Sequence, residues 1–264
     1  MGQVRSQDGT TIGYTRRGSG PAVVLVDGAM CYRAFGPLEK LAQALEDRFT
    51  VYTYDRRGRG ESGDTAPYAR EREVEDLAAL VEEAGGRAHL VGVSSGGTLV
   101  AEAVNLGVPA EKFVVYESPM VVDATHPPMP ADLPATLRDL VDTDRRGDAV
   151  KLFMRWVGTP GFFVAILPLL PPWKKLKPVA HTLPYDVEFV REFQHGTPLP
   201  ADRYAGAKAP GLVVAGAKSP EYMRNAQARL AEVLPNAELL VLPGQTHLVK
   251  ADALAPAVTD FLTR

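Results

Sequence analysis

The chain has few of the features that mark disulfide-rich, membrane or secreted proteins. It is 264 residues long and has one cysteine, Cys31, which excludes an intramolecular disulfide and is typical of a reducing compartment. The longest apolar run, residues 162–170, is interrupted by Pro168 and is too short to span a bilayer. Residues 1–13 have no apolar core of signal-peptide length. We therefore expect a soluble, cytoplasmic protein with no membrane span.

Excess charge and cofactor motifs are lacking as well. The formal net charge is −3, which gives no reason to expect nucleic acid or an anionic membrane as a partner. The sequence has no G-x-G-x-x-G loop, and no cluster of His, Cys or carboxylate residues has metal-ligand spacing. It therefore implies no cofactor and no metal, and it leaves a homo-oligomer open.

Strand and helix patterns alternate at both ends of the chain. Apolar or alternating runs predict strands at residues 4–6, 11–16, 22–26, 49–54, 88–93, 112–116, 211–215 and 237–242. Amphipathic spacing predicts helices at residues 37–48, 71–84, 98–105, 221–234 and 252–263. This alternation implies an α/β fold with a mostly parallel, doubly wound sheet and right-handed crossovers.

The middle of the chain interrupts this alternation. It has no convincing strand, and helical pieces at 133–142, 148–157 and 186–193 lie among many prolines. We therefore predict a core formed by residues 1–120 and 210–264, with a helical cap inserted at 121–209. Such a cap would lie above the carboxyl ends of the strands, where open α/β sheets bind ligands.

The segment from Leu90 to Gly97 carries the most informative motif. A buried strand is followed at once by Gly92-x-Ser94-x-Gly96 and then by a helix, which is the context of a nucleophile elbow. The turn strains its central residue, and glycine two positions before and after it keeps side chains away. Ser94 is therefore the predicted nucleophile. Ser95 is the weaker candidate because it lacks glycine two positions earlier.

Four motifs in order make the chain similar to the α/β-hydrolase superfamily. Asp27-Gly28-Ala29 lies where that family has its His-Gly oxyanion loop, and residues 55–62 match its D-x-R-G-x-G-x-S turn. The elbow follows, and Gly244-Gln245-Thr246-His247 lies after the last strand, where the family has its catalytic histidine. The resemblance implies the α/β-hydrolase fold with an inserted helical cap. It also implies an oxyanion hole formed by the backbone N–H groups of Ala29 and Ser95.

A serine nucleophile needs a base, and that base needs an orienting acid. His247 is the predicted base because its loop converges on the elbow. His89 lies in a buried run and is expected to pack in the core. The other three are expected on the surface or the cap, where one of them, His181, could contact substrate; these are His126, His181 and His195.

The acid departs from the family pattern. Most members have an aspartate a few residues after the strand equivalent to residues 212–215, but here Ser219 occupies that position. Glu117, directly after the strand that follows the elbow helix, is the predicted substitute. It resembles the Tyr-x-Glu acid of some haloalkane dehalogenases. Asp123 is the second candidate and Glu221 the third.

Other polar residues near these motifs are given structural roles. Asp27 is expected to hold loop residues by hydrogen bonds, for example to an arginine, and the neighbouring Cys31 to be an inert thiol. Three residues of the glycine-rich turn are expected to brace it: Asp55, Arg57 and Ser62. Two arginines of the same turn, Arg56 and Arg59, are expected to be solvated, as are Lys174, Lys175 and Lys177.

The predicted function is that of a serine hydrolase forming an acyl-enzyme on Ser94. Its substrate would be an ester, a lactone, a thioester or a carbon–carbon bond beside a ketone in a hydrophobic small molecule. Bulky apolar residues suggest the acyl-binding surface: Met30, Trp156, Phe162 and Trp173. Two alternatives stay open, a non-hydrolytic lyase or cyclase on the same fold and a catalytically weak ligand-binding receptor.

Overall fold

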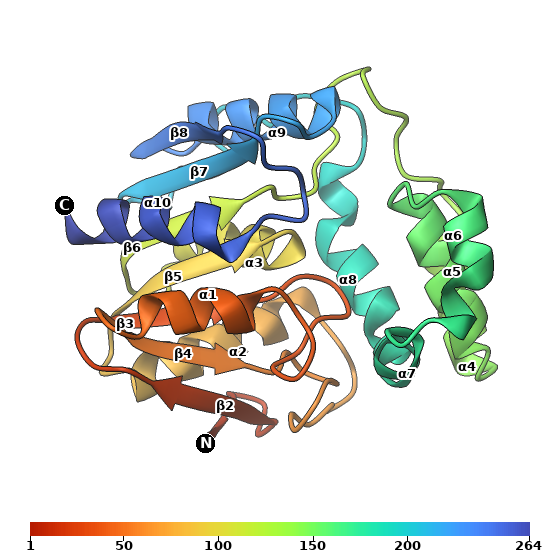
Figure 1. Ribbon diagram of the computed structural model, residues 1–264, viewed down its shortest axis with the longest axis horizontal. Helices are drawn as coiled ribbons and strands as arrows, with labels where there is room; N and C mark the ends of the chain where they lie inside the picture. The colour runs from red at the N-terminus through yellow and green to blue at the C-terminus, as the bar shows by residue number, and fades with distance from the viewer.

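The apolar runs of the chain pair into one eight-stranded sheet in the computed structural model, which describes residues 1–264 (Figure 1). The strand order is β1-β2-β4-β3-β5-β6-β7-β8. Only the β1–β2 and β2–β4 pairs are antiparallel; every other pair is parallel. The strands are β1 (Gly2–Arg5), β2 (Thr11–Arg17), β3 (Ala22–Val26), β4 (Thr50–Tyr54), β5 (Ala88–Val93), β6 (Ala110–Tyr116), β7 (Gly211–Gly216) and β8 (Ala237–Leu242).

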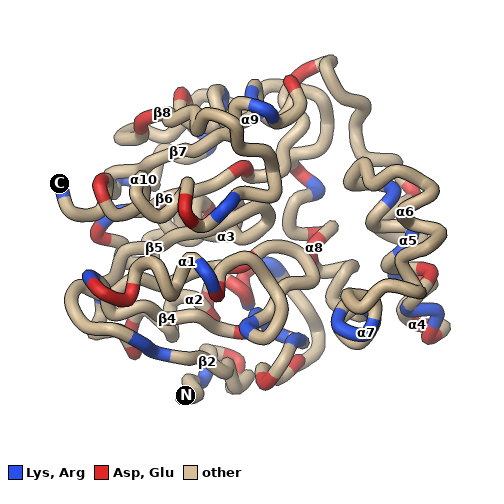
Figure 2. Tube along the Cα trace, viewed as in Figure 1, with Lys and Arg blue, Asp and Glu red and all other residues tan.

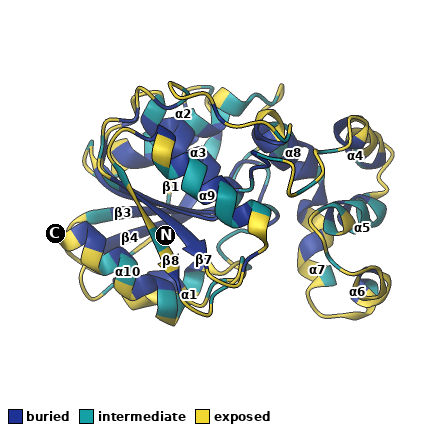
Figure 3. Ribbon diagram, turned by 90° about the horizontal axis from the view of Figure 1, so that it is seen from above, coloured by how far each residue is buried: buried dark blue, intermediate teal, exposed yellow.

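Helices cover both faces of this sheet, as the doubly wound prediction requires (Figure 3). One face carries α1 (Leu38–Leu45) and α10 (Ala251–Thr263), and the other carries α2 (Arg70–Glu83), α3 (Ser95–Asn105) and α9 (Glu221–Val233). A separate cluster of buried apolar side chains fills each of the two helix–sheet interfaces. Because β5 and β6 lie in the middle of the sheet, the residues that follow them are held by packing on both sides.

Residues 121–209, called the insertion below, contain no strand. Their helices are α4 (Leu133–Asp142), α5 (Arg146–Trp156), α6 (Gly161–Ile166), α7 (Trp173–Leu176) and α8 (Leu183–Val190), with 3₁₀ turns η1 (Leu167–Leu169), η2 (Lys177–Thr182) and η3 (Arg191–Phe193). They stand beside the carboxyl ends of the parallel strands, with α8 next to the sheet and α4 to α7 beyond it (Figure 1). The sequence did not predict α6 and α7, because six and four residues beside prolines are too short to display a helical period.

A third apolar cluster joins the insertion to the core through Met30, which packs with residues of α4, α5 and α8. The predicted solvation of Lys174, Lys175 and Lys177 is confirmed, since all three are exposed (Figure 2 shows the basic residues of α7). No helix of the protein has both the length and the apolar character needed to cross a membrane.

Candidate active site

The turn between β5 and α3 has the geometry that its glycines predict. Ser94 lies at φ 54° and ψ −128°, a region that non-glycine residues rarely adopt. A Cβ atom on Gly92 would overlap the carbonyl oxygen of Gly96, and one on Gly96 would overlap that of Val26. Both glycines are therefore required for α3 to start this close to β3 and β5, and the turn lifts the Ser94 side chain out of the sheet.

The structure brings Ser94, His247 and Glu117 into one hydrogen-bonded row. Nε2 of His247 lies 3.2 Å from Oγ of Ser94, and Nδ1 lies 3.0 Å from Oε2 of Glu117. The loop that carries His247 follows β8, and the Tyr116 hydroxyl holds it by donating to the carbonyl of Thr246 at 2.7 Å. Residues 94, 117 and 247 thus meet because the strands before them all end at the same edge of the sheet.

Glu117 supplies the carboxylate that contacts His247. Its side chain is completely buried, and its Oε1 accepts a 2.7 Å hydrogen bond from the backbone N–H of Gly216 at the end of β7. Ser219 is buried nearby, but its hydroxyl has no hydrogen-bond partner. The other two candidates do not reach the histidine: Asp123 accepts from Thr125 and Asn225, and Glu221 is exposed.

Backbone strain is concentrated around Ser94. Four non-glycine residues have positive φ, and three of them are Met30 at 57°, Ser94 at 54° and Glu117 at 47°. Such conformations cost roughly 1–3 kcal/mol each and persist only where the surrounding packing imposes them. Their coincidence at one site is typical of catalytic or ligand-binding centres.

Two backbone N–H groups beside Ser94 are available to a ligand. The N–H of Ala29 donates to no protein acceptor, and that of Ser95 belongs to the first turn of α3, where helix amides have no intrahelical partner. Gly28 lets its loop approach Ser94, because a Cβ added there would lie 3.1 Å from the Cβ of Ser94. The hydroxyl of Ser95 is buried and accepts from Nη1 of Arg56 at 3.0 Å, so it faces no histidine.

A pocket of about 180 Å³ opens over Ser94 and His247. Half of its 16 lining residues are hydrophobic. The lining comes mainly from the elbow, the insertion and the start of α9, and it also includes Ala29 and His247. Of the four residues predicted to contact substrate, only Trp156 lines it. Met30 is buried under the insertion, Phe162 is 64% exposed and stacks on Phe163, and Trp173 packs against Gly147. Apolar character alone did not separate packing residues from pocket residues.

The remaining histidines lie largely as predicted. His89 is buried at the edge of Phe49, and burial lowers its pKa. His195 is exposed, and His181 lies outside the pocket with Nδ1 3.0 Å from the Pro178 carbonyl. His126 is half-buried: its ring packs at a tilt against that of Tyr222, and it forms part of the pocket wall. Its place in the pocket wall was not predicted, because its loop carries no recognisable motif.

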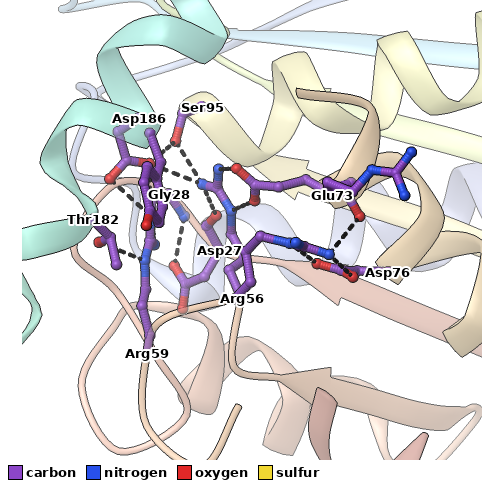
Figure 4. A network of polar contacts seen from close by, with 12 residues as sticks. Asp27, Gly28, Arg56, Arg59, Glu73, Asp76, Ser95, Thr182 and Asp186 are labelled. Carbon is purple, nitrogen blue, oxygen red and sulfur yellow. Dashed lines mark hydrogen bonds and ion pairs between the residues drawn. The ribbon is translucent and has the colours of Figure 1, made fainter. Parts of the chain in front are cut away.

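The expectation that Arg56 and Arg59 are solvated is wrong. Both are almost completely buried, and both pair with Asp186 of α8, at 3.1 Å and 2.7 Å (Figure 4). Arg56 also forms a two-point ion pair with Glu73. A charged turn at the end of a strand is typical of an exposed segment, and nothing near it in the sequence indicates that Asp186 of α8 is its buried partner.

The Asp27 carboxylate holds its own loop through the N–H of Gly28 and has no hydrogen bond from an arginine. Its Oδ1 accepts from the N–H of Gly28 at 3.0 Å, whereas Arg56 contacts only its backbone oxygen, at 3.4 Å. Complete burial raises the pKa of the Asp27 carboxyl to about 7, despite the opposing hydrogen bond from Gly28. Burial likewise raises the pKa of the Cys31 thiol, which agrees with an inert cysteine.

The bracing role predicted for the glycine-rich turn is confirmed. Asp55 accepts from the side chain of Arg33 and the N–H of Glu61, and Arg57 forms a two-point pair with Asp76. The hydroxyl of Ser62 donates to the Asp55 carbonyl. These contacts fix the turn that carries Arg56 and Arg59 inward.

Comparison with known proteins agrees with this architecture. The chain is 45% identical to an alpha/beta hydrolase from Sphaerobacter thermophilus DSM 20745, with 99% and 100% of the two chains covered and a TM-score of 0.91. An enol-lactonase from Burkholderia xenovorans LB400 is 22% identical with a TM-score of 0.73, both chains being covered fully. An esterase from Thermogutta terrifontis is 19% identical with a TM-score of 0.71, over 99% and 97% of the chains. These two likenesses show the fold alone.

No curated protein matches the sequence. The pattern of the family described as "Alpha/beta hydrolase family" matches residues 20–257, which is most of the chain. With the eight-stranded sheet and its flanking helices, this match establishes the relationship that the four motifs predicted: the protein is a member of the alpha/beta hydrolase family.

Proposed function

We propose that the protein is a serine hydrolase that cleaves carboxylic esters or lactones through an acyl-enzyme on Ser94. The observation that carries the proposal is the row Ser94–His247–Glu117, with spacings of 3.2 Å and 3.0 Å, at the base of a pocket. A serine hydroxyl becomes a nucleophile at neutral pH when a neutral imidazole accepts its proton and a carboxylate stabilises the imidazolium.

The steps follow from these positions. Oγ of Ser94 attacks the carbonyl carbon and its proton passes to Nε2 of His247, while the carbonyl oxygen becomes an oxyanion facing the N–H groups of Ala29 and Ser95. The intermediate collapses, and His247 returns the proton to the departing alcohol oxygen. Water then attacks the acyl-enzyme with His247 as base, which releases the acid and restores Ser94.

The pocket favours a compact, uncharged acyl group. No lysine or arginine lines it, and the carboxylate of Asp186 in its wall is already paired with Arg59 and Arg56. Its volume of about 180 Å³ is slightly larger than the roughly 150 Å³ cavity that holds a benzene ring. We propose that the insertion acts as the cap, because Trp156, Phe153 and Val190 supply much of the apolar wall. The neighbours named as an esterase and an enol-lactonase support ester-type substrates.

A fluorophosphonate probe with mass spectrometry tests the nucleophile directly. We expect the label on Ser94, turnover of p-nitrophenyl acetate and butyrate, and loss of at least 10³-fold in kcat for Ser94→Ala. Ser6→Ala, a change at a buried serine outside the site, is the control and should keep both. Turnover that survives Ser94→Ala would support the lyase or cyclase alternative instead. Tight ligand binding without labelling or turnover would support a receptor.

A further inference from the structure

Residues 27–31, called the oxyanion loop below, are held in place by the guanidinium group of Arg59. Nη1 of Arg59 donates to the carbonyl oxygens of Gly28 at 2.8 Å and Cys31 at 3.1 Å. Its Nη2 donates to both oxygens of Asp186, and its Nε donates to the hydroxyl of Thr182. All five N–H bonds of the guanidinium therefore have an acceptor, which fixes this side chain on every side. Figure 4 shows Arg59 between the loop and α8.

The bond to Gly28 matters because of the peptide unit to which that oxygen belongs. The carbonyl of Gly28 and the N–H of Ala29 are two ends of one planar trans peptide, so they point in opposite directions. A donor that fixes the oxygen on one side therefore fixes the N–H on the other side, where Ala29 lines the pocket beside Ser94. Hydrogen bonding of a cation to the carbonyl also polarises the peptide and strengthens its N–H as a donor.

Asp186 brings the insertion into this arrangement. Its carboxylate accepts hydrogen bonds from Arg59 at 2.7 Å and 2.8 Å. It also accepts one at 3.4 Å from the N–H of Met30, which directly follows Ala29. Met30 has a strained φ of 57°, so the loop needs contacts of this kind to keep its shape. Arg59 and Asp186 lie 127 positions apart in the sequence, one from the core and one from α8.

We propose that Arg59, paired with Asp186 of α8, is a positioning residue that orients the Gly28–Ala29 peptide so that its N–H faces the oxyanion. This inference rests on the proposed hydrolase function and adds the means by which the insertion supports catalysis. Arg59 does not touch the substrate. Its effect passes through the peptide unit to the transition state, so the ground-state affinity for substrate should change little.

The experiment compares two ion pairs that each join the core to the insertion. The test variant is Arg59→Gln with Asp186→Asn, which removes one positive and one negative charge together. The control is Arg203→Gln with Glu102→Gln, a pair at 2.8 Å that contacts neither residues 27–31 nor the turn of residues 55–62. Circular dichroism and thermal melts confirm that each variant is folded before kinetics are measured.

The readouts are kcat, KM and the affinity of a trifluoromethyl ketone, which forms a tetrahedral anionic adduct with the nucleophile. Loss of one oxyanion donor lowers kcat by about 10²–10³-fold in a well-studied protease. Since the Ala29 N–H is misdirected here rather than deleted, we expect kcat and ketone affinity to fall together by about 10- to 100-fold, with KM within about threefold. The control pair should change each by less than about threefold.

Two results would overturn the inference: a folded test variant with kcat and ketone affinity within threefold of the wild type, or an equal loss in the control. If the test variant does not fold, Arg59→Lys decides the question. It keeps the charge beside Asp186 but cannot donate five bonds, so kcat should fall about tenfold, and unchanged kcat contradicts the proposal. Fluorophosphonate labelling of the wild type distinguishes failure of the Arg59 proposal from failure of the proposed function. If Ser94 is not labelled, the serine-hydrolase function itself is rejected.

Discussion

Replacement of Glu117 by glutamine is the sharpest test of the candidate triad. The change keeps the size of a completely buried side chain and removes its negative charge. In the native site the two carboxylate oxygens have separate partners: Oε1 accepts from the N–H of Gly216 at 2.7 Å, and Oε2 lies 3.0 Å from Nδ1 of His247.

These two partners determine the orientation of the amide group of a glutamine at position 117. The N–H of Gly216 requires an acceptor, so the amide oxygen of the glutamine would face it and the NH₂ group would face His247. The imidazole would then have to accept at Nδ1 and carry its proton on Nε2, where it could not receive the proton of Ser94. This is the wrong-tautomer effect, which costs about 10⁴-fold in kcat in the chymotrypsin-type triad.

The lost charge acts in the same direction. Two unit charges 3.0 Å apart attract by about 5 kcal/mol at an effective dielectric constant of about 20. His247 is 38% exposed, so solvent screening reduces this to about 3 kcal/mol, or about 10²-fold in rate. We therefore expect kcat of Glu117→Gln to fall by 10²- to 10⁴-fold with KM nearly unchanged.

Steady-state hydrolysis of p-nitrophenyl butyrate measures this loss. Ser219→Ala, at the position where the family resemblance predicts the acid, and Asp123→Asn, which alters only contacts to Thr125 and Asn225, serve as matched controls. Each should stay within about threefold of the wild type. A Glu117→Gln enzyme within tenfold of the wild type, or a larger loss in Ser219→Ala, would refute the assignment of the acid.

Three further outcomes follow from the structure. Asp27 has a pKa raised by burial from 3.8 to about 7, so its contribution to stability is present below pH 4 and is lost as the pH rises to 7. Urea unfolding at several pH values should show the wild type losing about 4 kcal/mol relative to Asp27→Asn across this window, and parallel curves would contradict the raised pKa. Gly92→Ala forces a Cβ onto the Gly96 carbonyl and should lower the free energy of unfolding by at least about 2 kcal/mol, a loss that a normal melting curve would exclude. Trp156→Ala should raise KM several-fold while Phe162→Ala leaves it within twofold, and the reverse order would mean that substrate binds outside the described pocket.

The sequence alone was sufficient for the fold and for the elements around Ser94. A strained turn needs glycine at fixed offsets from its centre, so Gly92 and Gly96 predict the elbow from eight adjacent residues. Glu117 and His247 were also predictable, because Glu117 directly follows one strand pattern, His247 lies in the loop after another, and parallel strands deliver their carboxyl ends to one edge. For the elbow the constraint lies in the local backbone and therefore appears in neighbouring residues, whereas for Glu117 and His247 it lies in the parallel order of the strands.

The tertiary structure decided which charges and which aromatic rings reach the site. Arg59 is buried only because Asp186, 127 residues later, supplies a carboxylate in the same place, and no local pattern records such a partner. Trp156 reaches the pocket while Phe162, six residues on, faces outward, since the packing of α5 and α6 and not their composition sets the direction of each ring. The burial of a charge and the contacts between distant segments depend on how the whole chain packs. They could therefore be identified from the tertiary structure but not from the sequence.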